Sequence, residues 1–405
     1  MTVDPVSRRT GSPALVEVFG AFLKLGLTSF GGPIAHLGYF REEFVARRKW
    51  LDEKTYADLV ALCQFLPGPA SSQVGVAVGI ARRGLLGGAA AWLGFTLPSA
   101  AALVLFAYGV LAFGNGLGSG WLHGLKVVTV SVVAQAVWAM SQNLLRGRAH
   151  TSIAVLAALG TLALPGSSGQ LAVIAAAALA GWCLLPSATV AQSDAVRFPV
   201  SRRTGIVAWV LFFVLLAVLP AAAKISQTAW LQMFDSFYRS GALVFGGGHV
   251  VLPLLQAEVV PRGWVTNDAF LAGYGAAQAV PGPLFTFAAY LGAAMQPAPN
   301  DWLGAALCLV AIFLPAILLV VGALPFWQQL RRSAAAQSAL AGVNAGVVGL
   351  LFAALYDPVW VSSIHSSGDF GLALAAFALL VVGRIAPWLV VALCALAGAL
   401  LHYMG

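Results

Sequence analysis

The chain has 405 residues, of which 60% are hydrophobic and 9% are charged. Soluble domains usually contain about 25% charged residues, so this composition excludes a soluble fold and indicates an integral membrane protein. The formal net charge of +8 is expected to set membrane orientation, and no nucleic-acid partner is predicted because no soluble basic face is visible.

The first apolar segment lies between a basic N-terminal tail and the basic run at 41–49. Lys and Arg mark the cytoplasmic side of a membrane protein. We therefore expect this segment to enter and leave on that side, bending at the Gly-Gly-Pro motif at 31–33. The next segment, 52–83, should form a second hairpin that bends at the Pro-Gly-Pro motif at 67–69. Each limb has roughly 15 residues, whereas a span needs about 20. An alternative is that the first limb crosses the membrane fully.

About four spanning helices should follow the two hairpins and complete an N-terminal transporter repeat at residues 1–186. The segment 187–205 is the longest polar stretch, and we predict that it is a cytoplasmic linker. A C-terminal repeat at 206–405 begins with an extra helix, 206–223, and then shows the same succession of motifs.

The two halves contain similar segments in the same order. Three pairs align at nearly constant offset: Phe19–Pro33 with Phe234–Gly248, Gln64–Ser72 with Gln278–Thr286 and, more loosely, His123–Val133 with Ala341–Leu351. Chance would give one such pair but hardly several in order, so the chain is interpreted as an internal repeat.

Basic residues are distributed oppositely in the two halves. The first half is basic at 41–49 and 82–83, where the second half has a single Arg or no cation. The second half is basic at 331–332, where the first half is uncharged. By the positive-inside rule the repeats have opposite orientations. The sequence thus predicts an all-α polytopic membrane protein with two inverted-topology repeats. Each repeat would have two helical hairpins broken at Gly/Pro motifs and about four spanning helices.

The four breaks are the candidate substrate site. Unpaired backbone groups inside a membrane cost several kcal/mol each, so four breaks at repeat-equivalent places need a reason. Proline suits the first turn of a helix, and the exposed N–H groups of a helix start bind anions. A compact oxyanion would fit four such helix starts near the midplane. The residues that we predict to bind it are Gly31, Gly32, Pro33, Gln64, Gly68, Pro69, Ser71, Ser72, Gly246, Gly247, Gln278, Gly282, Pro283 and Thr286. The alternative is that these motifs only kink packed helices; likewise, the two glutamines could cap the broken helices instead.

Two cations occupy equivalent places in the first limbs, Lys24 and Arg239. A cation within a membrane helix is costly, so the pair could face the anion across the pseudo-twofold axis. Snorkelling, or pairing with an acid such as Asp235, is an equal alternative. Candidates for proton coupling are His36, His249, Glu43 and Glu258. For the histidines a structural hydrogen bond is the alternative, and for the glutamates a salt bridge near the basic residues.

The segment Phe30–Gly75 resembles the N-terminal signature of the chromate transporter family. The segments Val244–Val260 and Ala272–Gly292 resemble the second-half counterpart of that signature, so the resemblance covers the long, two-domain form. It implies a multi-pass protein of the inner (plasma) membrane that exports chromate from the cytoplasm and confers chromate resistance. It also implies secondary active transport driven by the membrane potential or a proton gradient, with sulfate as a competing anion. Residues alone lead only to a small-anion transporter.

Other function classes are less consistent with the sequence. No Walker motif is present, and the six histidines are scattered without an HExxH motif, so neither an ATP-driven pump nor a metalloenzyme is predicted. The four cysteines form no CxxC motif, and no cofactor or metal is expected. Two alternatives stay open: a transporter for another small inorganic anion such as sulfate, and a channel, which broken helices would also allow. The expected partners are the anion, the lipid bilayer and, as an option, a second copy in a homodimer.

Overall fold

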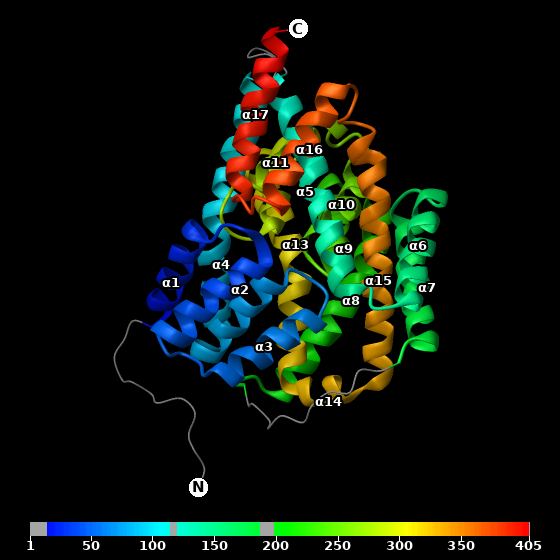
Figure 1. Ribbon diagram of the computed structural model, residues 1–405. Helices are drawn as coiled ribbons and strands as arrows, with labels where there is room; N and C mark the ends of the chain where they lie inside the picture. Colours follow the sequence, from blue (N-terminus) through cyan, green and yellow to red (C-terminus); the bar gives the residue numbers. More distant parts are fainter. Residues whose placement is uncertain (1–13, 114–119, 187–197, 405) are drawn as a thin grey trace.

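The computed structural model describes residues 14–113, 120–186 and 198–404. The predicted N-terminal tail and most of the predicted linker lie outside these ranges. Within them the regular secondary structure is helical (Figure 1). Six helical segments are long and apolar enough to cross a membrane: Ala70–Val110, Gly120–Leu144, Ser167–Leu184, Arg202–Ser226, Asp301–Phe326 and Ala334–Trp360. The chain is therefore a multi-pass membrane protein.

The first repeat begins with two broken hairpins. Helices α1 (Ala14–Thr28) and α2 (Gly32–Arg41) form the first, and α2 continues into a π-helical turn, Glu42–Arg47. Helices α3 (Glu53–Phe65) and α4 (Ala70–Phe113) follow. Non-helical backbone at Arg83 and Gly84 divides α4. Its first part is the outgoing limb of the second hairpin, and its second part is a spanning helix.

The remaining helices of the first repeat are α5 (Gly120–Leu144), α6 (Arg148–Ala163) and α7 (Ser167–Leu184). Helix α8 (Arg202–Ser226) follows and includes the residues of the predicted extra helix. It packs against α9 and α13, which belong to the second repeat.

The second repeat has the same order of elements. The hairpins are α9 (Ala229–Ala242) with α10 (Val251–Val259), and α11 (Asn267–Ala277) with α12 (Phe287–Ala294). Short 3₁₀ turns, η2 (Gly248–Val250) and η3 (Leu284–Thr286), precede α10 and α12. The helices that follow are α13 (Asp301–Ala323), α14 (Trp327–Arg332), α15 (Ala334–Ala354), α16 (Ser367–Val381) and α17 (Pro387–Met404). A π-helical turn, Leu355–Trp360, extends α15.

Helices of each repeat pack against helices of the other repeat. Helix α5 packs against α16 and α17, and its counterpart α15 packs against α6 and α7. Glycines permit both close approaches: a Cβ at Gly124 would lie 2.1 Å from the Cys394 carbonyl oxygen, and one at Gly342 would lie 2.2 Å from the Ala177 carbonyl oxygen. In Figure 1 the α5–α6 connection lies toward the lower end and the α15–α16 connection toward the upper end. Equivalent connections thus lie at opposite ends, as inverted topology requires.

Candidate functional site

All four breaks contain glycines in a backbone conformation that other residues rarely adopt. The φ angles are +99° at Gly31, +121° at Gly68, +71° at Gly246 and +97° at Gly282. A side chain in this region costs roughly 1–2 kcal/mol per residue. Glycine is therefore needed for the chain to turn at these places, as the repeat pattern predicted.

Two backbone hydrogen bonds connect the breaks across the repeats. The Gly68 N–H donates to the Val244 carbonyl at 2.6 Å, and the Gly282 N–H donates to the Ser29 carbonyl at 2.9 Å. Gly68 and Gly282 are equivalent positions in the repeat alignment, and so are Ser29 and Val244. The second break of each repeat is thus bonded to the first break of the other.

The breaks also approach one another and the spanning helices closely. A Cβ at Gly248 would lie 3.8 Å from Leu284 and 3.9 Å from Pro33, so the third break is next to the fourth and the first. A Cβ at Gly282 would lie 2.8 Å from the Ser99 Oγ atom of α4, and one at Gly68 would lie 2.9 Å from the Ala316 Cβ atom of α13. The four breaks therefore form one compact region, which we call the break centre.

Helices begin at this centre. Pro33 lies in the first turn of α2, Pro69 immediately precedes α4, and Pro283 immediately precedes η3. The unpaired N–H groups of a helix start carry partial positive charge, which favours an anion. Helix starts of this kind can contribute N–H groups to the binding of a small anion.

His36 is the polar side chain that links two parts of the break centre. Its Nδ1 atom lies 3.3 Å from the Ser71 Oγ atom, and its Nε2 atom lies 3.2 Å from the Ser29 carbonyl oxygen. The imidazole is 1% exposed and packs edge-on against Phe95. The structural hydrogen bond, which was one of the two alternatives for His36 in the sequence analysis, is therefore present.

Several buried polar atoms in this region have no partner within the described part of the chain: Ser29 Oγ, Ser72 Oγ, Gln73 Oε1, Thr96 Oγ1 and Gln278 Nε2. Buried polar groups in proteins almost always have hydrogen-bond partners, so these atoms are available to a ligand or water. The Thr286 hydroxyl, in contrast, donates to the Pro283 carbonyl at 2.7 Å. Gln64 is exposed, unlike its half-buried equivalent Gln278.

His249 lies in η2, next to the third break. Its Nδ1 atom is 2.8 Å from the hydroxyl of Tyr274 on α11. Each repeat therefore places a histidine near its first break, with His36 buried and His249 half-buried, at positions that are not equivalent in the sequence.

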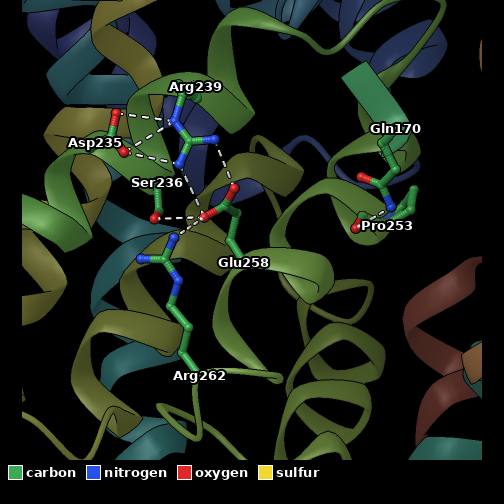
Figure 2. Close-up of polar contacts among 7 residues, drawn as sticks. All are labelled: Gln170, Asp235, Ser236, Arg239, Pro253, Glu258 and Arg262. Carbon is green, nitrogen blue, oxygen red and sulfur yellow. Dashed lines mark hydrogen bonds and ion pairs between the residues drawn. The ribbon is translucent and has the colours of Figure 1, made fainter. Parts of the chain in front are cut away.

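The two predicted cations are neutralised by acids. Arg239 makes bonds of 2.9–3.1 Å to the Asp235 carboxylate and of 2.8 and 3.2 Å to Glu258 (Figure 2). Glu258 also accepts from Arg262 and from the Ser236 hydroxyl. The pairing with Asp235, one of the two sequence-based alternatives, is thus the arrangement in the structure.

The first repeat has a weaker version of this network. Lys24 lies 3.4 Å from Glu43, which also pairs with Arg47 and Arg48. The Lys24 side chain is 51% exposed, whereas that of Arg239 is 16% exposed. Gly20 occupies the position equivalent to Asp235, so the first repeat lacks that second acid.

Sequence reasoning did not identify Ser29, Val244, Ser99 or Tyr274. The carbonyls of Ser29 and Val244 carry no side-chain signal, because every residue has a carbonyl. Ser29 could have been noted as a polar residue directly before a break, and Ser99 as the residue after Pro98.

We expect His36→Phe to lower both stability and transport. The phenyl ring can keep the contact with Phe95, but it leaves the Ser29 carbonyl and Ser71 hydroxyl without their partner. An unsatisfied buried polar group costs about 1–3 kcal/mol. The thermal unfolding midpoint in detergent should fall, and Tyr39→Phe, a change on the same helix at a residue that is 43% exposed, should leave it unaltered. An unchanged midpoint in both variants would contradict this role for His36.

Comparison with known proteins identifies the family. The model of the family described as "Chromate transporter" matches residues 16–182 and 231–399. A chromate transport protein from Pseudomonas aeruginosa is 32% identical over 86% of this chain and 82% of its own length. A probable chromate transport protein from Synechococcus elongatus is 27% identical over 90% of this chain and 89% of its own. An uncharacterized transporter from Bacillus subtilis, YwrA, is 29% identical and aligns over 86% of its length with only 36% of this chain. No solved structure matches. The chain therefore belongs to the chromate transporter family.

Proposed function

We propose that this protein is a secondary active transporter that exports chromate from the cytoplasm across the inner membrane and so confers chromate resistance. The relatives named as chromate transport proteins support the substrate, since they align with most of the chain. We further propose sulfate as a competitor, because both anions are tetrahedral and carry two negative charges. The functional units would be the repeats at 1–186 and 206–405, joined by the linker at 187–205.

The observation that carries this proposal is the break centre. Two reciprocal backbone hydrogen bonds bring four helix breaks together, with unpartnered buried polar atoms around them. A helix N-terminus binds anions through its N–H groups and its dipole. We assign anion binding to the break residues, with Ser71, Ser72 and Gln278 as the side-chain donors.

The cations would act differently from the break residues. Lys24 and Arg239 are engaged by Glu43, Asp235 and Glu258, so recognition by helix dipoles and neutral donors is favoured over a free cation. A site without a free cation binds a dianion less tightly than a site with one. Release is then easier, because the dianion does not have to be separated from a fixed full positive charge. For proton coupling we propose His36, because it alone of the four candidates contacts both a break carbonyl and a predicted substrate donor.

Uptake of labelled chromate into inside-out membrane vesicles tests this function. We expect energised vesicles to accumulate chromate, de-energised vesicles to lose most of that uptake, and excess sulfate to compete. Vesicles without the protein are the control. Uptake of sulfate without uptake of chromate would establish the alternative, a transporter for another small anion. Uptake that only follows the anion's own gradient would instead indicate a channel.

A further inference from the structure

The first repeat places several hydroxyl side chains at buried positions of the break centre. None of these residues is more than 5% exposed: Ser29, Ser71, Ser72, Thr96 and Ser99. They come from the end of α1, the start of α4 and the part of α4 beyond its kink. His36 contacts the Ser71 Oγ atom and the Ser29 carbonyl. The Ser99 hydroxyl, which a Cβ at Gly282 would approach to 2.8 Å, donates to the Thr96 carbonyl at 3.1 Å. The three segments therefore meet at the breaks.

The second repeat has apolar residues at most of the equivalent positions. With Pro98 of α4 matched to Pro315 of α13, the counterparts of the five hydroxyl residues are Val244, Phe285, Thr286, Phe313 and Ala316. These residues are at most 2% exposed. The rings of Phe285 and Phe313 lie 5.7 Å apart, so aromatic packing occupies the place of two hydroxyls. The repeats thus differ here in chemistry and not in burial.

Three of the first-repeat hydroxyls have no hydrogen-bond partner among the residues that the structure describes. They are Ser29 Oγ, Ser72 Oγ and Thr96 Oγ1, in side chains that are 0%, 5% and 1% exposed. A buried hydroxyl without a partner destabilises a protein, and such groups are rare in native structures. Three of them in one region indicate that a ligand supplies the missing acceptor.

Polar side chains of the second repeat near the breaks have partners of their own. Thr286, the counterpart of Ser72, donates to the Pro283 carbonyl, and His249 is bonded to the Tyr274 hydroxyl. The exception is Gln278, whose Nε2 atom has no partner in the described ranges. Gln278 ends the incoming limb of the break whose Gly282 N–H donates to the Ser29 carbonyl. This donor is therefore brought to the first break.

We propose that one oxyanion binds per chain, on the first-repeat side of the break centre, and that Ser29, Ser72 and Thr96 donate hydrogen bonds to it. Ser29 and Thr96 are thereby added to the anion site. Thr96 lies three residues before Ser99, on the same face of α4. The Ser99 Oγ atom lies against Gly282, so the Thr96 hydroxyl is directed to the same region. This inference rests on the proposed transport function, because it names donors at that same site.

The equivalent place in the second repeat cannot hold a second anion. Val244, Phe285 and Phe313 have no side-chain donor, and the Thr286 hydroxyl is already used. A dianion buried against these residues would lose its hydration without gaining hydrogen bonds, which is strongly unfavourable. At the first-repeat hydroxyls it gains charge-assisted hydrogen bonds, which are stronger than those between neutral groups.

Anion binding and thermal unfolding, measured on the same variants, test the site. Purified protein in detergent is dialysed against labelled chromate, and its unfolding midpoint is measured without the anion. We expect wild type to bind one chromate per chain. Ser29→Ala and Thr96→Val should each weaken the affinity about tenfold, because a hydrogen bond to a charged group is lost. The midpoint of the anion-free variants should be unchanged or higher, because an unpartnered buried hydroxyl has been removed. A lower midpoint in both variants would show that the hydroxyls are structural, and would overturn this inference.

Ser363→Ala is the matched control. Ser363 is 0% exposed, and its Oγ atom also has no partner in the described part of the chain. It lies in the connection between α15 and α16, toward the upper end of Figure 1. Its variant should bind chromate with wild-type affinity. Ser72→Ala replaces Thr96→Val should the latter fail to reach the membrane.

The outcomes separate this inference from the proposed function. Wild-type affinity in Ser29→Ala and Thr96→Val, or two chromate ions per chain, would overturn the inference and leave chromate transport intact. Binding of labelled sulfate but not of chromate, weakened in the same two variants, would support the site and remove chromate as the substrate. Binding of neither anion by wild type would overturn both proposals.

Discussion

Gly282→Ala is expected to reduce chromate uptake by about tenfold or more, since a loss of about 1.4 kcal/mol at the binding step already gives a factor of ten. The new methyl group would meet the Ser99 Oγ atom at 2.8 Å and the Phe95 carbonyl oxygen at 3.2 Å. The φ angle of +97° adds backbone strain of about 1–2 kcal/mol. Both effects displace the N–H that donates to the Ser29 carbonyl. Concentration-dependent uptake should show the loss mainly as weaker affinity.

Gly147→Ala is a closely matched control. Gly147 also has a φ angle of +97°, and a Cβ there would meet nothing within 4 Å. It precedes α6, away from the breaks. The two variants should lose similar stability through strain, but only Gly282→Ala should lose affinity. A double variant, Gly282→Ala/Ser99→Gly, removes the contact and should recover part of the uptake. Equal uptake in the Gly282 and Gly147 variants would show that the break centre is not the anion site.

Arg239→Ala should destabilise the fold far more than Lys24→Ala, although the two positions are equivalent. Removing Arg239 leaves the carboxylates of Asp235 and Glu258 buried, at 6% and 2% side-chain exposure. Breaking a buried ion pair in this way costs about 3–5 kcal/mol. Lys24 is half-exposed, and Glu43 keeps Arg47 and Arg48 as partners, so its loss should cost about 1 kcal/mol or less.

Thermal unfolding in detergent and the amount of protein in the membrane measure this difference. Arg239→Lys keeps one positive charge but loses the bidentate geometry, and it should lie between wild type and Arg239→Ala. Transport per folded molecule gives the second readout. If Arg239→Ala were as stable as wild type and inactive, Arg239 would belong to the anion site rather than to the support of α9 and α10.

The sequence was sufficient to predict the architecture and the location of the breaks. Glycine and proline at equivalent places identify broken helices. Glycine readily adopts positive φ angles, and proline, which lacks an N–H, suits the first turn of a helix. The opposite charge distribution predicted the inversion. Both signals can be read from the sequence without knowledge of the tertiary contacts.

The sequence could not decide what each polar side chain contacts. Lys24 and Arg239 are equivalent in the alignment, yet one is half-exposed and the other is enclosed by two acids. Gln64 and Gln278 likewise differ in exposure. Gly20 stands where Asp235 supplies an acid to Arg239, and the exposure of each side chain also depends on which helices pack around it.

Helix α8 has a consequence for the orientation of the two repeats. A repeat made of two re-entrant hairpins and four crossings returns to the side on which it started, so a second copy joined directly to it would face the same way. One additional crossing changes the parity. We propose that the single helix Arg202–Ser226 is this additional crossing, which would let the two repeats of one chain face opposite ways.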